Sequence, residues 1–168
     1  MDTLFRSLRT KLILVVGLGL LLILAGYAYR DMKTFENFYL EEARKKALDI
    51  TDTAIKSIEY PMLDGEMEDV QRILERINAL KDLRVINLCN SDGIIRYSGN
   101  PERIGKIISS KSSLEALRTH TLTQGLEKRF GEKIYRYTVP ILNEKACYKC
   151  HGSEKRILGA LTMAFVWT

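Results

Sequence analysis

The residues best suited to chemistry lie near the C-terminal end, in the run Cys147-Tyr148-Lys149-Cys150-His151. This C-x-x-C-H spacing is the pattern of covalent c-type haem attachment. Each thiol can bond one vinyl group of a porphyrin, and the adjacent imidazole can then bind the iron as an axial ligand. We therefore predict that Cys147 and Cys150 hold one covalently attached haem c and that His151 is its proximal iron ligand.

Three other interpretations of this run need features that the sequence does not offer. Structural zinc takes four ligands, whereas the chain has 3 cysteines and 2 histidines and no second cysteine pair. A thioredoxin-like redox pair belongs in a βαβ context, which the residue pattern does not show. A structural disulfide between Cys147 and Cys150 would close a very small loop and leave His151 without a role. These interpretations remain the minor ones.

Haem c is attached outside the bacterial cytoplasm, and the chain contains a segment that can carry the motif there. The stretch Leu12–Tyr29 has 18 residues and no charge, which is the length of a membrane-spanning helix. It is longer and richer in leucine than a typical signal sequence, and Ala25-Gly26-Tyr27-Ala28 is a weak cleavage site. A retained transmembrane helix is therefore favoured over a cleaved signal sequence.

The charges before this stretch predict its orientation. Arg6, Arg9 and Lys11 precede it, and positively charged flanks stay in the cytoplasm. We therefore predict a single-pass protein of the bacterial inner membrane with its N-terminus in the cytoplasm. Its parts are a cytoplasmic tail (residues 1–11), a transmembrane helix (12–29) and a periplasmic domain (30–168).

The residues after the membrane segment show the periodicity of helices. From Asp31 to about Tyr60, apolar residues recur at steps of three and four, which is the spacing of one helical face. These residues are Phe35, Phe38, Tyr39, Ala43, Ala47, Ile50, Ala54 and Ile58. Pro61 is expected to end this helix, because proline disfavours helical conformation in the residue before it. A second helix is expected from about Glu66 to Leu80.

After Lys81 the pattern changes to short β segments separated by turn residues. Asn90-Ser91-Asp92-Gly93 is a hairpin turn signal, since Asp-Gly tolerates positive φ. The haem loop, Asn143–Arg156, is expected to be polar and irregular. We predict an α+β domain with five mostly antiparallel strands. The expected strands cover residues 83–89, 94–98, 121–130, 133–142 and 157–167, with a short helix over 112–118.

The distribution of charge and the third cysteine point to no further functional site. Residues 31–92 carry 9 basic and 14 acidic side chains, whereas residues 96–156 carry 13 basic and 6 acidic ones. A basic surface near a haem can offset its propionates or attract an acidic partner, and an ordinary solvated surface is the alternative. The basic residues lack the aromatic interleaving of a single-strand binder, so no nucleic-acid partner is expected. Cys89 lies in an apolar run and is expected to be a small buried side chain.

Four features together resemble a known kind of domain. They are the membrane helix that leads into a long helix, the segment Pro61-Met62-Leu63-Asp64-Gly65, the turn Asp92-Gly93 followed by Arg103-Ile104-Gly105, and the haem motif leading into Leu158-Gly159-Ala160-Leu161-Thr162. In these features the chain resembles the periplasmic c-type haem PAS-like (Cache-like) sensor domains of bacterial chemoreceptors and sensor histidine kinases. The resemblance implies a five-stranded antiparallel sheet with helices to one side.

The resemblance also implies partners and a second iron ligand. It implies a homodimer through residues 31–60 and a haem whose second axial position is taken by a methionine, by water or by a small gas. Such receptors continue into a second membrane helix and an output domain, whereas this sequence ends at Thr168. Ile157–Trp167 is too short to span a bilayer. We therefore expect either part of a receptor or a stand-alone haem protein that delegates its output.

Several side chains could be the distal iron ligand. Met62 is favoured, because it follows Pro61 in the segment that carries the resemblance. A thioether ligand raises the reduction potential of a haem relative to a second histidine. Met67 and His120 are weaker choices, and so is Met163. The plain alternative for each methionine is packing in the core, and for His120 it is a surface position.

The favoured function is a membrane-anchored sensor of redox state or of a small gaseous ligand. Such a sensor would pass its signal along the N-terminal helix to a downstream signalling output. The alternative is a membrane-tethered monohaem cytochrome c that carries electrons, although such carriers are usually small helical bundles. A haem enzyme such as a peroxidase is weaker still, because no distal acid–base pair is evident. We therefore expect no enzymatic activity.

Overall fold

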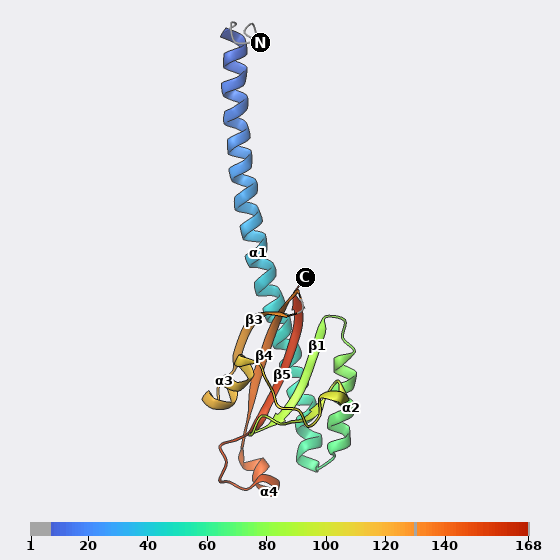
Figure 1. Ribbon diagram of the computed structural model, residues 1–168. Coiled ribbons are helices and arrows are strands. Elements are labelled where there is room, and N and C mark those ends of the chain that lie inside the picture. Colours follow the sequence, from blue (N-terminus) through green and yellow to red (C-terminus); the bar gives the residue numbers. More distant parts are fainter. Residues whose placement is uncertain (1–7, 130, 168) are drawn as a thin grey trace. The chain divides into compact units, whose positions relative to one another are not determined.

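The computed structural model describes residues 8–129 and 131–167, and the chain divides into two compact units, residues 1–45 and 46–168. The first unit holds the beginning of helix α1 (Leu8–Asp64), which is drawn in blue in Figure 1. In the described part of the chain, one stretch is long and apolar enough to cross a membrane, Arg9–Phe35, and 0% of its apolar window is buried. It contains the predicted span 12–29, and exposed apolar side chains are expected where the solvent is lipid.

From Lys46 onward, α1 belongs to the second unit and has a buried face. Ala47, Thr51, Ala54 and Ile58 are at most 3% exposed and follow one another at helical spacing. The lower half of the predicted apolar stripe is therefore confirmed. Two of its upper members, Tyr39 and Ala43, lie outside the described side chains.

The prediction that Pro61 ends this helix is wrong. The helix continues through Pro61 to Asp64. Proline loses only the hydrogen bond that its missing N–H would have given to the carbonyl oxygen of Ser57. The helix ends at Gly65, whose φ is 82°, and the N–H of Glu66 donates to the carbonyl oxygen of Pro61 at 2.9 Å. This is the bond of a Schellman motif, so glycine and not proline is the stop signal.

Within the described residues, the strands form one five-stranded antiparallel sheet in the order β2-β1-β5-β4-β3 (Figure 1). The predicted α+β class and antiparallel sheet are confirmed. The last strand of the chain, β5, lies at the centre and pairs with both β1 and β4. The strands are β1 (Leu83–Asn90), β2 (Ile95–Ser98), β3 (Thr123–Arg129), β4 (Glu132–Leu142) and β5 (Ile157–Trp167).

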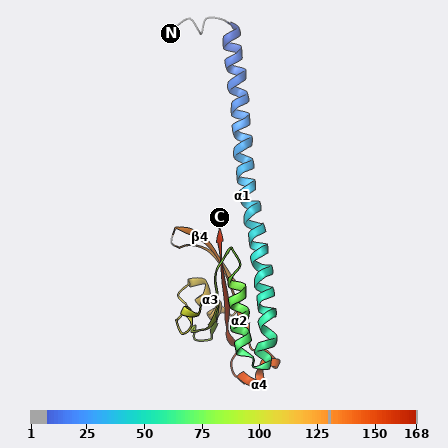
Figure 2. The ribbon, with the colours of Figure 1, turned by 90° about the vertical axis from the view of Figure 1, so that its right-hand side faces the viewer.

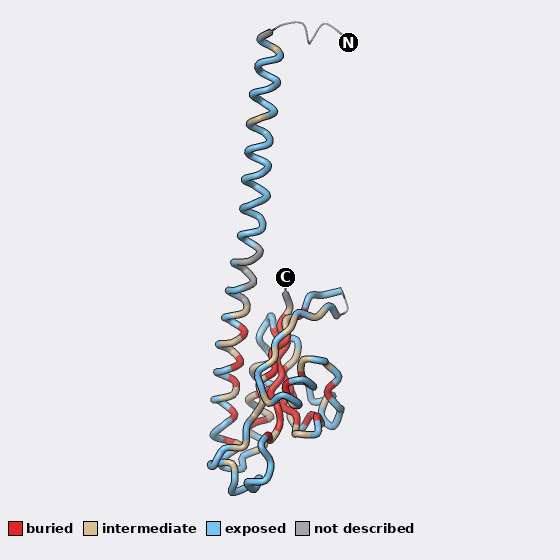
Figure 3. Tube along the Cα trace, turned by 90° about the vertical axis from the view of Figure 1, so that its left-hand side faces the viewer, coloured by how far each residue is buried: buried red, intermediate tan, exposed pale blue. Residues whose placement is uncertain are grey.

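The C-terminal part of α1 and helix α2 (Met67–Asn78) pack on one face of this sheet. Side chains from both helices meet those of β4 and β5 in the main core, which includes Ile58, Leu74, Tyr137 and Met163. In Figure 3 the buried residues of the second unit follow the sheet and this part of α1. Alternate residues of a strand point to opposite faces, so neighbours such as Thr138 and Thr162 point away from these helices.

Helix α3 (Lys111–Thr119) lies on the opposite face, as Figure 2 shows. Its fully buried Ser113 hydroxyl lies 3.1 Å from the hydroxyl of Thr138 and 3.0 Å from that of Thr162. The expectation that helices cover one side of the sheet is therefore wrong for α3. The short helix has small buried residues, Ser113 and Ala116, and they allow it to approach this polar part of the sheet closely.

Replacing Gly159 with alanine is expected to destabilise the second unit. An added Cβ would lie 1.9 Å from the carbonyl oxygen of Cys89, which is backbone and cannot rotate away. We expect the unfolding free energy of the variant to fall by about 1–3 kcal/mol, the usual cost of overpacking. The measurement is chemical unfolding followed by circular dichroism.

Gly125→Ala on β3 is the matched control, because an added Cβ there meets nothing within 4 Å. Its unfolding free energy should stay within about 0.5 kcal/mol of the parent value. Equal stability of the two variants would contradict the close packing of β5 against β1.

Candidate functional site

The C-x-x-C-H run lies in the connection between β4 and β5, and it is helical. A 3₁₀ turn, η2 (Lys145–Cys147), leads directly into a short helix, α4 (Tyr148–His151). The expectation of an irregular haem loop is therefore wrong at the motif itself. Such short turns leave no periodic pattern in a sequence, so hydrophobic spacing could not reveal them.

The helical conformation places the three predicted haem residues on one side of the turn. Cys147, Cys150 and His151 are separated by three and four positions, and residues at these spacings share a helical face. Cys147 is half-buried, whereas Cys150 and His151 are exposed. Among the described residues all three cysteines are free thiols. Two accessible thiols beside one accessible imidazole are the donor set that a covalently bound haem c requires, so these residues fit that group.

Asn143 closes the base of this loop, and the sequence analysis did not single it out. Its Nδ2 donates hydrogen bonds to the carbonyl oxygens of Gly152 at 2.7 Å and Lys155 at 2.8 Å. Its backbone N–H donates to the carbonyl oxygen of Arg156 at 3.1 Å. The only sequence signal is a polar residue directly after an expected strand, which is too common to identify a clamp.

The predicted distal ligands lie in different places. Met62 and Met67 flank the turn between α1 and α2, are half-buried and pack against the edge of the main core. Figures 1 and 2 both show this turn beside α4, at the same end of the second unit. The structure therefore brings the segment of the favoured ligand Met62 near the C-x-x-C-H motif.

The other two candidates for the distal iron ligand, His120 and Met163, are in less suitable positions. His120 is the C-cap of α3, with a left-handed φ of 57°, and α3 packs on the face of the sheet away from α1 and α2. Met163 is 0% exposed in the middle of β5, where it is part of the main core. Met163 thus has the packing role that was its plain alternative.

Cys89 is separate from the haem motif, and its predicted role as a small buried side chain is confirmed. It is 3% exposed, and its Sγ donates to the carbonyl oxygen of Ala160 at 3.4 Å. Burial raises the pKa of the Cys89 thiol, because the thiolate would lose its hydration. No cluster of three or more His, Cys, Asp or Glu suited to a metal ion occurs in the part of the chain that the structure describes.

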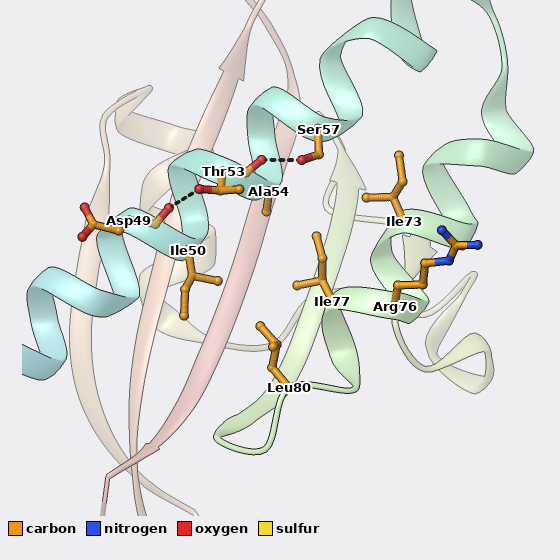
Figure 4. Close-up of a pocket in the computed structure, with 9 residues that line it drawn as sticks. All are labelled: Asp49, Ile50, Thr53, Ala54, Ser57, Ile73, Arg76, Ile77 and Leu80. Atoms are coloured by element: carbon orange, nitrogen blue, oxygen red, sulfur yellow. Dashed lines mark hydrogen bonds between the residues drawn. The ribbon is translucent and has the colours of Figure 1, made fainter.

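An open groove of about 410 Å³ lies between α1 and α2 (Figure 4). Its lining is mainly apolar and includes Ile50 of α1 and Ile73 and Ile77 of α2. Two hydroxyls on α1 form hydrogen bonds within the helix: Thr53 donates to the carbonyl oxygen of Asp49, and Ser57 donates to that of Thr53. The groove therefore offers contact area and few free polar groups.

Comparisons with known proteins identify a family of sensor domains. The family described as methyl-accepting chemotaxis sensory transducer, class 40H, sensor, matches residues 52–166. No curated protein sequence matches the chain significantly.

Three solved structures are similar. The E. coli DcuS sensor domain is 21% identical, with a TM-score of 0.44 over 57% of this chain and 65% of that one. The sensor domain of the V. cholerae histidine kinase DctB is 17% identical, with a TM-score of 0.41 over 69% and 42%. An extracellular ligand binding receptor from Desulfohalobium retbaense DSM5692 is 15% identical, with a TM-score of 0.43 over 69% and 24%. The chain thus spans less than two thirds of each structure.

The burial of the cysteines predicts how they react. In protein made without haem attachment, iodoacetamide at mildly alkaline pH should modify Cys147 and Cys150 first, whereas Cys89 should react only after unfolding. Its raised pKa leaves less thiolate at a given pH, and its burial excludes the reagent. Peptide mass spectrometry after timed labelling measures the three rates. Labelling of native Cys89 as fast as of Cys150 would contradict this part of the structure, and the denatured protein is the control for full reactivity.

Proposed function

This chain belongs to the sensor family of the class 40H methyl-accepting chemotaxis sensory transducers, and we propose that it is a membrane-anchored haem c sensor of this kind. Cys147 and Cys150 would hold the haem covalently, and His151 would be its proximal ligand. When bound, such a haem supplies an iron that changes redox state or binds a small gas. The observation that supports this most directly is the single helical turn that presents two free thiols and an imidazole together.

Met62 is the proposed distal ligand. It lies in the last turn of α1, which ends at the same end of the second unit as α4 in Figures 1 and 2, and Pro61, one residue earlier, donates no hydrogen bond to the preceding turn. The turn can therefore shift at a lower cost than an intact helix end. Retention or release of the Met62 thioether would give the turn two arrangements, which is the local change that a switch needs.

Helix α1 is the proposed path of the signal. It is one helix from Leu8 to Asp64, so the same element contains the membrane-spanning stretch and the proposed distal ligand, Met62. We place the N-terminus in the cytoplasm and the haem domain in the periplasm of a bacterial inner membrane, in line with the positive flank. A homodimer through residues 31–60 would couple two such helices to a downstream output. One wall of the apolar groove is formed by α1 residues of this stretch, such as Ile50, and the other by α2, and this supports a packing surface there.

The alternative of a tethered electron carrier is not favoured. The family is one of sensors, and the domain is built on a sheet rather than on a small helical bundle around the haem. An enzymatic role has no support from the described geometry either. His120 caps α3, on the face of the sheet away from α1 and α2.

Haem attachment is the first expected outcome. Protein purified from cells that mature cytochromes c should carry the added mass of one haem, and pyridine haemochrome spectra should show two thioether bonds. The double variant Cys147→Ser/Cys150→Ser should lose both signals, whereas Cys89→Ala should keep them. An unmodified polypeptide mass without Soret absorption in the wild-type protein would refute the proposal.

The second expected outcome is that the distance between the α1 helices of a dimer depends on the state of the haem. Spin labels at exposed Lys45 should report a different distance between the α1 helices of a dimer when the haem is oxidised, reduced or bound to CO. Met62→Ala should abolish the difference between the states and weaken the far-red band of methionine–iron ligation. Met67→Ala is the matched control, because it removes an equally half-buried thioether from the same turn. Identical distances in all three states of the wild-type haem protein would count against sensing.

A further inference from the structure

Asn143 links the chain before the motif to the chain after it. Its own position precedes η2, and its hydrogen-bond partners, Gly152, Lys155 and Arg156, all follow α4. The residue next to the motif histidine, Gly152, is thereby fixed at its carbonyl oxygen. The N–H of Gly152 donates to the carbonyl oxygen of Tyr148 at 3.0 Å, so Gly152, the residue after His151, is held at both its N–H and its carbonyl oxygen.

The carboxamide of Asn143 is used for its N–H groups and not for its oxygen. Both hydrogens of Nδ2 point at carbonyl oxygens, at 2.7 and 2.8 Å. Its Oδ1 is buried, and no donor for it is found among the described residues. A buried acceptor without a partner costs free energy. The two hydrogen bonds that Nδ2 donates offset the cost of burying Oδ1. Aspartate, which has no donor and carries a charge, could not replace it.

The loop has a second local constraint at the same point. Gly152 has φ 69° and ψ 178°, a conformation that side chains with a Cβ rarely adopt. This glycine turns the chain away after His151 and directs its carbonyl oxygen to Asn143. The two residues together define where the chain runs directly after His151.

We propose that Asn143 is a positioning residue for the proximal ligand: by fixing Gly152, the residue next to His151, it sets how firmly the imidazole holds the iron. The inference rests on the proposed haem function and deepens it. Outer-shell groups that orient a metal ligand typically contribute about 10–100-fold to metal affinity. Asn143 acts through the backbone, and it does not touch the iron.

The test compares two Asn→Asp substitutions in the full-length haem protein. In Asn143→Asp, two donors are lost and a carboxylate faces two carbonyl oxygens, so binding of His151 to iron should weaken by about tenfold. The ferric absorption spectrum should then show a larger high-spin fraction, and the midpoint potential should move, while the haem mass stays attached through Cys147 and Cys150.

Asn100→Asp is the matched control. Asn100 uses its Oδ1 to accept the N–H of Glu102 at 3.1 Å, and aspartate can do the same. It introduces the same charge but should leave the spectrum and potential unchanged. Asn143→Gln retains two amide hydrogens on a longer arm and should recover part of the low-spin signal. Hydrogen exchange in β1 and β5 checks that each variant is folded.

The outcomes separate the two proposals. Wild-type protein without haem refutes the proposed function itself. Wild-type protein with haem, together with an Asn143→Asp variant of unchanged spectrum and potential, overturns the positioning role alone. If Asn143→Asp does not fold, Asn143→Ala replaces it: a larger high-spin fraction in the alanine variant than in Asn143→Gln supports a role for the amide hydrogens, and an alanine spectrum identical to that of the wild type overturns it. Equal spectral change in Asn143→Asp and Asn100→Asp overturns that role.

Discussion

Antiparallel pairing of β4 with β5 is the constraint on which the candidate site depends. The two strands pair from Lys133 opposite Trp167 to Leu142 opposite Ile157, and the N–H of Asn143 continues the ladder to Arg156. Paired strands lie about 4.8 Å apart, so the connecting loop must begin and end within that distance. Because its ends lie close together, this loop can hold a short helical turn beyond the ends of these strands. The hydrogen bond between Asn143 and Gly152 closes the loop at its base.

The two faces of the sheet serve different purposes. Toward α1 and α2, side chains such as Tyr137, Leu161 and Met163 form a dry core that joins the end of α1 to the sheet. Toward α3, a small apolar cluster that Leu117 packs against lies beside paired polar groups: Ser113 meets the threonine hydroxyls, and Arg136, with 5% of its side chain exposed, contacts Glu127 at 3.2 Å. Pairing offsets the cost of burying these polar groups, and the hydroxyl contacts of Ser113 fix the position of α3 on the sheet.

Local patterns predicted much of the architecture. Helical spacing marked the part of α1 that packs in the domain, alternation and turn residues marked the strands, and Asp92-Gly93 lies where β1 turns into β2. The errors came from competing local rules. Pro61 by itself predicts a helix stop, but its loss of one hydrogen bond is outweighed by a buried helix face, and the chain turns at Gly65 instead. The helical turns of the motif are too short for any periodicity to register.

By itself, the sequence determined the chemistry on offer and the kind of elements. The C-x-x-C-H spacing, the apolar stretch before Arg30 and the α+β pattern are all local properties, because each depends on neighbours a few residues apart. Only the tertiary structure decided what lies beside the motif. The turn that carries Met62 and Met67 is about eighty residues away in sequence, and the sheet brings it to the end of the unit where α4 lies. The clamp by Asn143 likewise depends on strand register, which is a non-local pairing that no local pattern specifies.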